Sequence, residues 1–179
     1  QLPKTKSVIA HIAGSRGLSS LNPHKRIGLI HPLVSLPNPQ IGEERLTNNA
    51  WFAINGDPFM QKIVDILGGT SFFLNDQDRA LYHATACIAS NHLVVLLEQV
   101  RRLADQLNIP FEAFLNLSQG SLDSISELNP KEALTGPAAR KDEETLKAHL
   151  ESLPEKELVL YKSMVEEAKR LSTQDNHQE

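Results

Sequence analysis

The sequence predicts a two-part fold, in which a short α/β segment is followed by a larger all-helical one. Up to residue 75, short β-branched apolar runs alternate with glycine and proline, which is typical of strands joined by tight turns. From residue 76 to about residue 107 the chain has no glycine or proline and is apolar on almost every side, which predicts one long helix. We therefore expect part of a parallel sheet over residues 1–75 and a helical domain over residues 76–179.

The first part contains four predicted strands and one predicted helix. The strands are residues 7–13, 26–31, 50–55 and 70–74. Asp57 and Pro58 suit the start of a helix, and Gly68 and Gly69 end it just before the fourth strand. Because one helix cannot cover both faces of a parallel sheet, either more sheet precedes Gln1 or the strands pair less regularly. We favour the first alternative.

The second part is predicted to be helical almost throughout. A first helix of about 30 residues would be about 45 Å long, and its apolar surface must be buried by neighbouring helices or by a second subunit. Pro110 begins a second helical stretch that runs to about Leu128, with a break at Gly120 as an alternative. Asp142 suits the N-cap of a third helix, and Pro154 the start of the last.

Composition narrows the class of protein. With 40% apolar and 22% charged residues the chain is globular in type. The net charge is -4 and the basic residues are scattered, so we expect no nucleic-acid partner. The longest unbroken apolar run, residues 93–97, is far shorter than the roughly 20 residues that span a bilayer, so we expect no membrane partner. A single cysteine, Cys87, excludes an internal disulfide and fits a reducing, cytoplasmic location.

The long helix carries a polar stripe. At 100° per residue, its members fall within a stripe about 100° wide. They are His83, Cys87, Ser90, Asn91 and the apolar Val94. Burying each of these polar groups without a hydrogen-bond partner would cost roughly 1–3 kcal/mol, so they need partners. The stripe therefore indicates a site, or alternatively hydrogen bonds to neighbouring backbone or to a dimer mate. His83 suits acid–base work near neutral pH, whereas Cys87 is better explained as a small core residue than as a nucleophile.

Two further histidines stand at predicted strand ends. His31 ends the second strand, at the edge where open α/β sheets place their ligands. His11 lies near the end of the first strand and is followed by Gly14 and Ser15. The alternative for both is a solvated histidine in a polar loop.

The third candidate is an anion site at a helix start. Arg140 lies just before the helix that Asp142 is expected to cap, and a guanidinium near a helix N-terminus can bind a carboxylate or phosphate. The alternative is an exposed arginine in a loop. The sequence contains no H-E-x-x-H, no paired C-x-x-C and no G-x-S-x-G, so no motif supports a metal site or a serine hydrolase.

Four segments in the same order resemble proteins that join a Rossmann-like domain to domain-of-unknown-function family 2520. The segments are Ile30–Pro37, Ala50–Asp57, Ala80–Asn91 and Ala133–Arg140. The resemblance covers nearly the whole chain. It implies that the strand and glycine-rich turn that hold a dinucleotide precede Gln1, so that residues 1–75 are the C-terminal half of a Rossmann-like domain. Residues 76–179 are then the substrate and dimerisation domain.

The family in turn resembles the 6-phosphogluconate-dehydrogenase-like reductases, including ketopantoate reductases and prephenate dehydrogenases. This implies NAD or NADP as the cofactor, a helical domain that closes over the nicotinamide, and a homodimer. His31-Pro32 is similar to the His-Pro of prephenate dehydrogenases, and Ser90-Asn91 falls where those enzymes carry Ser-His. Many hydroxyacid dehydrogenases place a catalytic lysine one turn before an asparagine similar to Asn91, but here that position is Cys87. Since the lysine is absent, His83 or His31 would have to supply the proton.

The leading hypothesis is an NAD(P)-dependent oxidoreductase that transfers a hydride between nicotinamide and a small carbonyl or alcohol substrate. His83 would be the acid–base group, with Asn91 and Ser90 orienting the substrate. The other predicted site residues are His31 and Ser35 in the floor, Arg140 for an anionic substrate group, and His11, Gly14 and Ser15 beside the cofactor. One alternative is a non-catalytic dinucleotide or metabolite sensor, which the missing lysine favours. Another is a helical dimerisation module whose polar stripe is buried between subunits.

Overall fold

The computed structural model describes residues 5–173, and the chain divides into two compact units, Gln1–Val95 and Leu96–Glu179. The beginning of the long helix thus belongs to the same compact unit as the sheet. The domain boundary expected after residue 75 rests on composition and stays a prediction.

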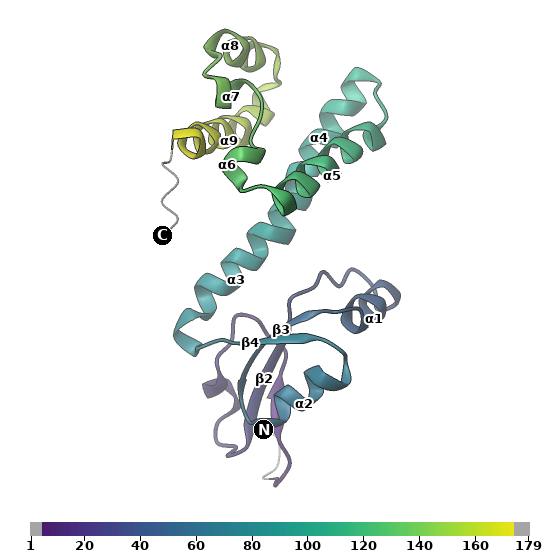
Figure 1. Ribbon diagram of the computed structural model, residues 1–179, viewed down its shortest axis with the longest axis vertical. Coiled ribbons are helices and arrows are strands. Elements are labelled where there is room, and N and C mark those ends of the chain that lie inside the picture. Colours follow the sequence, from purple (N-terminus) through teal and green to yellow (C-terminus); the bar gives the residue numbers. More distant parts are fainter. Residues whose placement is uncertain (1–4, 174–179) are drawn as a thin grey trace. The chain divides into compact units, whose positions relative to one another are not determined.

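The first unit contains a four-stranded mixed sheet in the order β1-β2-β3-β4 (Figure 1). The strands are β1 (Ile9–His11), β2 (Ile27–Pro32), β3 (Trp51–Gly56) and β4 (Thr70–Phe73). β1 pairs with β2 in parallel and β3 with β4 in parallel, but β2 and β3 are antiparallel. The expectation of a parallel sheet is therefore wrong for the middle pair. The connection from β2 to β3 leaves and re-enters the sheet at the same end, where Leu33 N–H donates to Trp51 O at 2.8 Å. β3 therefore runs antiparallel to β2.

Two helices accompany the sheet. α1 (Pro39–Thr47) was not predicted. Its start nevertheless has two usual features of a helix N-terminus, since the Asn38 side chain accepts from Ile41 N–H and proline occupies the first turn. α2 (Phe59–Ile66) packs against β2, β3 and β4. The hydrophobic core between α2 and the sheet consists of Ile30, Ala50, Phe52, Met60 and Val64. Short 3-10 turns lie at Leu18–Leu21 and Asp76–Asp78.

The long helix is continuous, as predicted, but it contains a widened turn. α3 (Arg79–Cys87) passes into a π-helical turn (Ile88–His92) and then into α4 (Leu93–Leu107). Single π turns are rare inside α-helices and occur often at functional sites. The turn adds a residue to one helical repeat, so side chains after it point in directions that a regular helix would not give.

The helical run from Asp76 to Leu107 is long and apolar enough to cross a membrane, judged by length and composition alone. Its most apolar 18-residue window has a mean hydropathy of 1.4, and none of that window is buried within the described part of the chain. Core helices of soluble proteins can pass the same test, so the absence of a membrane partner stays a prediction.

The second unit is helical throughout. After α4 it contains α5 (Phe111–Glu127), α6 (Pro130–Ala133), α7 (Pro137–Arg140), α8 (Glu143–Ser152) and α9 (Glu155–Thr173). α5 runs through Gly120 without a break, which a helix tolerates at a cost of about 1 kcal/mol relative to alanine. The Asp142 side chain accepts from Thr145 N–H and so caps α8 as predicted.

An ion pair between a half-exposed arginine and a buried glutamate ties α4 to α9. Glu157 is 2% exposed, and its carboxylate accepts two hydrogen bonds from Arg102, Nε at 2.9 Å and Nη2 at 2.8 Å. Gln99 on the preceding turn donates to the Glu157 carbonyl at 2.9 Å. The hydrogen bonds from Arg102 hold the pKa of Glu157 below its usual value of 4.5, although burial opposes the shift.

This ion pair predicts a pH-dependent stability. Because the folded-state pKa is lowered, the contribution of Glu157 is complete above pH 4.5 and disappears as the pH falls through the folded-state pKa. Glu157→Gln should therefore unfold at a lower urea concentration than the wild type at pH 7, and the difference should shrink at pH 3. Glu167→Gln, which removes an exposed ion pair with Arg170 on the same helix, should have little effect at either pH. A gap that is constant with pH would contradict this role for the carboxylate.

Candidate functional site

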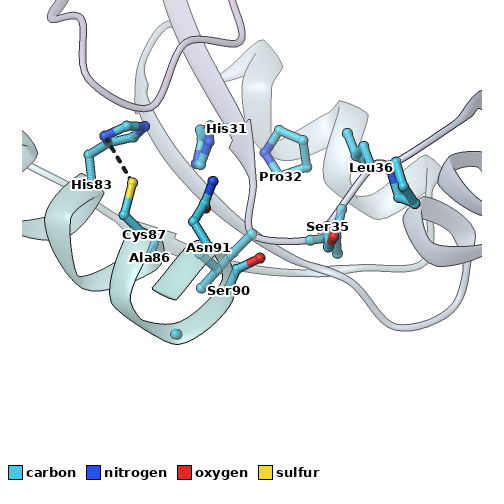
Figure 2. A pocket seen from close by; sticks show the side chains of 13 residues that line it. His31, Pro32, Ser35, Leu36, His83, Ala86, Cys87, Ser90 and Asn91 are labelled. Carbon is cyan, nitrogen blue, oxygen red and sulfur yellow. Dashed lines mark hydrogen bonds between the residues drawn. The ribbon is translucent and has the colours of Figure 1, made fainter. Parts of the chain in front are cut away.

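The candidate site is a cavity of about 360 Å³ in the first unit (Figure 2). One wall is the segment from His31 to Pro37, which ends β2 and leads away from it. The other wall is formed by one side of α3 and the π turn: His83, Ala86, Cys87, Ala89, Ser90 and Asn91. The predicted stripe and the predicted strand end thus meet, because His31, Ser35, His83, Ser90 and Asn91 all line this one cavity.

His31 forms the link between the two walls. Its Nδ1 lies 2.7 Å from the Tyr82 hydroxyl of α3, and the two rings meet edge to face with centroids 5.5 Å apart. The His83 ring centroid is 6.4 Å away. Burial lowers the pKa of His31 below its ordinary value, and the nearby His83 and Arg79 lower it further. The surroundings of His31 therefore favour the uncharged form of its ring.

Gly14 lets the two imidazoles approach the loop that follows β1. A Cβ atom at this position would lie 2.7 Å from His83 Cδ2 and 2.8 Å from His31 Nε2, distances that real side chains essentially never show. Gly14 does not line the cavity, but its lack of a side chain makes space for two residues that do. It acts here through packing, and its predicted contact with a cofactor stays a prediction.

The π turn determines which helix residues face the cavity. His83 and Cys87 lie one turn apart, with Nδ1 and Sγ 3.8 Å from each other, and Ser90 and Asn91 follow within the widened turn. Figure 2 shows Asn91 pointing toward His31. Val94 was expected in the same stripe but does not line the cavity and is 66% exposed. The extra residue in the π turn rotates the positions after it, which explains this error.

Besides Gly14, three further predicted site residues lie outside the cavity. His11 accepts from Ala13 N–H at Nδ1 and bonds to the Gly17 carbonyl through Nε2 at 3.3 Å, so its ring is occupied by its own loop. Ser15 is exposed. Arg140 belongs to the second unit, where it is exposed and lies 4.0 Å from the Asp142 carboxylate. Cofactor contact by His11 or Ser15 and anion binding by Arg140 remain predictions.

Sequence reasoning missed the residues behind the cavity wall. Tyr82 bonds to His31 and also meets Phe72 edge to face at 5.8 Å. Arg79 is only 1% exposed and donates to Asp76 Oδ1 at 3.0 Å. The available signal was the Asp76–Arg79 spacing of three residues at the start of an apolar helix, since such a guanidinium can be buried when it is paired.

Apart from the imidazoles of His31 and His83, the polar groups that line the cavity are uncharged, and the rest of the lining is apolar. Neither lysine nor arginine lines it, so it has no cation for a diphosphate. Imidazole, hydroxyl and carboxamide groups instead suit the polar reacting end of a small molecule. Across residues 5–173, no three His, Cys, Asp or Glu side chains are grouped so that they could hold a metal ion.

Replacing Gly14 tests the packing behind the cavity. Gly14→Ala should destabilise the protein by about 1–3 kcal/mol, the usual cost of overpacking, because the new methyl group must displace both imidazoles. Gly120→Ala is the matched control. Nothing lies within 4 Å of the corresponding Cβ position in α5, so this change should stabilise the protein by up to about 1 kcal/mol. Urea denaturation of both variants measures whether each change lowers or raises the free energy of unfolding. A Gly14→Ala protein as stable as the wild type would show that the histidines are not held against this loop.

Comparisons with known proteins place the fold. Residues 51–168 match the family described as "Domain of unknown function (DUF2520)". The structure of protein TM1727 from Thermotoga maritima is similar, with a TM-score of 0.72 and 24% sequence identity over 92% of this chain and 68% of that one. BF3122 from Bacteroides fragilis, a candidate NADP oxidoreductase, gives a TM-score of 0.78 and 22% identity over 91% of this chain and 65% of that one.

A more distant similarity extends to a reductase with a bound cofactor. Plasmodium falciparum pyrroline carboxylate reductase, solved with NADP bound, gives a TM-score of 0.54 and 13% identity over 93% of this chain and 71% of that one. No curated protein matches the chain. At these identities the likeness shows the fold, and it confirms the predicted Rossmann-like sheet followed by a helical region. The chain spans about two thirds of the length of these structures.

Proposed function

The chain belongs to the DUF2520 family, and we propose that it is the substrate-side part of an NAD(P)-dependent oxidoreductase. It would transfer a hydride between nicotinamide and a small carbonyl or alcohol substrate. One observation carries this proposal: two imidazoles, a carboxamide and two hydroxyls line a single cavity at the end of β2. The fold similarity to a candidate NADP oxidoreductase and to a reductase solved with NADP supports it.

The cavity contains the groups that a carbonyl–alcohol interconversion needs. Oxidation of an alcohol removes a hydride from carbon and a proton from oxygen, and reduction returns both. The nicotinamide, when bound, supplies or accepts the hydride. We assign the proton to His83, whose imidazole lines the cavity, and the orientation of the substrate oxygen to Asn91 and Ser90.

The phosphates of the dinucleotide require another part of the protein. Because no lysine or arginine lines the cavity, a diphosphate would meet only uncharged groups and histidines there. The similar structures are longer than this chain, and we assign phosphate binding to a segment that corresponds to their additional length. The residues that line the cavity therefore suit only the nicotinamide end of the cofactor.

The acid–base assignment predicts a specific loss of activity. In a version that includes a dinucleotide-binding segment, His83→Ala should lower kcat roughly 100- to 10,000-fold, the range of general acid–base catalysis, and leave the fold intact. NADPH oxidation with a panel of small carbonyl compounds measures kcat, and circular dichroism monitors the fold. His92→Ala, an exposed histidine on the same helical run, is the control and should retain activity. Wild-type turnover in His83→Ala would remove His83 from the proton-transfer role.

A sensor without turnover is the second candidate. It is favoured by Cys87, which occupies the position where similar hydroxyacid dehydrogenases carry a catalytic lysine. A sensor would bind NADPH and a metabolite in the longer version but would transfer no deuteride from deuterated NADPH to any carbonyl compound. Detectable transfer would exclude this candidate.

The proposal also includes a homodimer. Apolar side chains of the long helix are exposed both before and after the π turn, among them Leu81 by 75%, Ile88 by 59% and Val95 by 59%. None of them lines the cavity, and burying them against a second copy would remove apolar surface from water.

If the dimer forms through the long helix, placing charged side chains on its exposed apolar positions should lower the mass of the particle in solution. Sedimentation equilibrium should give a dimer for the wild type and a monomer for the double variant Leu81→Glu/Val95→Glu. The control is Ile12→Glu, which changes an apolar residue that is 68% exposed in the loop after β1 and should leave the dimer intact. A wild-type monomer, or a chain that sediments with liposomes, would contradict the homodimer.

A further inference from the structure

We propose that Tyr82 is a positioning residue that holds His31 in the tautomer with its proton on Nε2, so that His31 is an uncharged hydrogen-bond donor to the substrate oxygen. This inference rests on the proposed function of the same cavity. It adds a residue behind the cavity wall to the residues that line it, and it favours a carbonyl compound as the substrate.

The ring of Tyr82, on α3, is held by side chains from two strands of the sheet, β2 and β4. His31 on β2 pairs with Ala53 on β3, and Ala53 pairs with Phe72 on β4, so the three lie in one row across the sheet. Side chains that are paired in this way share a face. Ala53 is small and fully buried, which leaves space for a ring from α3 to reach both neighbours. Tyr82 does so, with its centroid 5.5 Å from that of His31 and 5.8 Å from that of Phe72.

The direction of the hydrogen bond determines the tautomer. Tyr82 Oη and His31 Nδ1 are 2.7 Å apart, and either atom could donate. A phenol is a stronger acid than a neutral imidazole N–H, and an imidazole nitrogen is a stronger base than a phenol oxygen. The hydroxyl therefore donates to Nδ1, and the ring proton is left on Nε2. Within residues 5–173 this Nε2, which lies beside Gly14, has no hydrogen-bond partner, so its N–H is the donor that the proposal assigns to a ligand.

The charged groups around His31 favour an uncharged ring. From α3, Arg79, Tyr82 and His83 face it; from the sheet its paired neighbour is Ala53, and from the loop after β1 the nearest backbone is Gly14. None of these groups is a carboxylate that could stabilise an imidazolium, and Arg79 opposes one. The lowered pKa of His31 agrees with this arrangement.

The same charges favour a particular substrate. A neutral N–H donor with a buried guanidinium behind it stabilises an oxygen on which negative charge develops, as on a carbonyl that receives a hydride. A substrate that is already cationic would be disfavoured. The geometry thus suits carbonyl reduction better than binding of an amine.

Histidine NMR tests the tautomer without cofactor or substrate. On the 179-residue chain labelled with ¹⁵N-histidine, two-bond ¹⁵N–¹H correlations at pH 7 distinguish a proton on Nε2 from one on Nδ1. We expect the Nε2–H pattern for His31 in the wild type. In Tyr82→Phe, which removes only the hydroxyl, we expect a mixture of tautomers and a shifted Nδ1 resonance.

Tyr161→Phe is the matched control. The Tyr161 hydroxyl lies 2.6 Å from Nδ1 of His149 in the second unit, with the rings edge to face at 5.9 Å, so it is the same type of pair at another place. This variant should change the His149 resonances and leave those of His31 unaltered. Assignment uses His31→Gln, which removes the His31 resonances.

The outcomes separate this inference from the proposed function. An Nδ1–H pattern for wild-type His31, or an unchanged pattern in Tyr82→Phe, would overturn the inference whether or not the protein is an enzyme. In the longer version, the inference expects Tyr82→Phe to lower kcat about tenfold with KM nearly unchanged, the loss of one hydrogen bond of about 1.4 kcal/mol in the transition state. Absence of turnover in every version would instead overturn the proposed function and leave the tautomer result intact.

Discussion

The geometry of the candidate site depends on how the start of α3 is held against the sheet, and Asp76 provides that attachment. Its carboxylate accepts from Leu18 N–H at 2.8 Å, from Arg79 Nε at 3.0 Å and from Asn55 Nδ2 at 3.4 Å. The loop after β1, the end of β3 and the first turn of α3 therefore meet at one group. Burial opposes ionisation of Asp76, but the hydrogen bonds from Arg79 and Leu18 hold its pKa below the usual value. A buried arginine without this partner would be strongly unfavourable, so the pair fixes where the helix begins.

Once α3 is fixed at this end, its position over the sheet follows. Tyr82, one turn after Arg79, reaches across Ala53 to His31, and His83 lies beside it against Gly14. The π turn then directs Ser90 and Asn91 toward the segment that follows β2. Every residue that lines the cavity belongs to the first compact unit.

Much of this could be predicted from sequence, because periodicity reports local structure well. The strands, α2, the long helix and the Asp142 cap lie within a few residues of their predicted places, and the family resemblance is confirmed by the match over residues 51–168. The antiparallel pairing of β2 and β3 could not be predicted, since strand direction depends on the edge to which a connection returns. The π turn and the burial of Arg79 also escaped prediction, because both are set by tertiary contacts and leave no periodic signal. For the same reason the sequence could bring His31 and His83 into one hypothesis but could not identify Tyr82 between them.

The absence of a lysine from the cavity changes the type of catalysis that the site could support. A lysine in the wall would present a full charge to the substrate oxygen, whereas the wall carries Cys87, whose Sγ lies 3.8 Å from His83 Nδ1. The positive charge lies instead on Arg79, which is 1% exposed and is paired on one side with Asp76, while its Nη1 has no partner among the described residues. A charge buried behind neutral donors acts through a low-dielectric interior, where it is screened less than at a surface. Under the proposed function, His31 would carry the hydrogen bond to the substrate and Arg79 the electrostatic field behind it, a division of roles that a single lysine would otherwise combine.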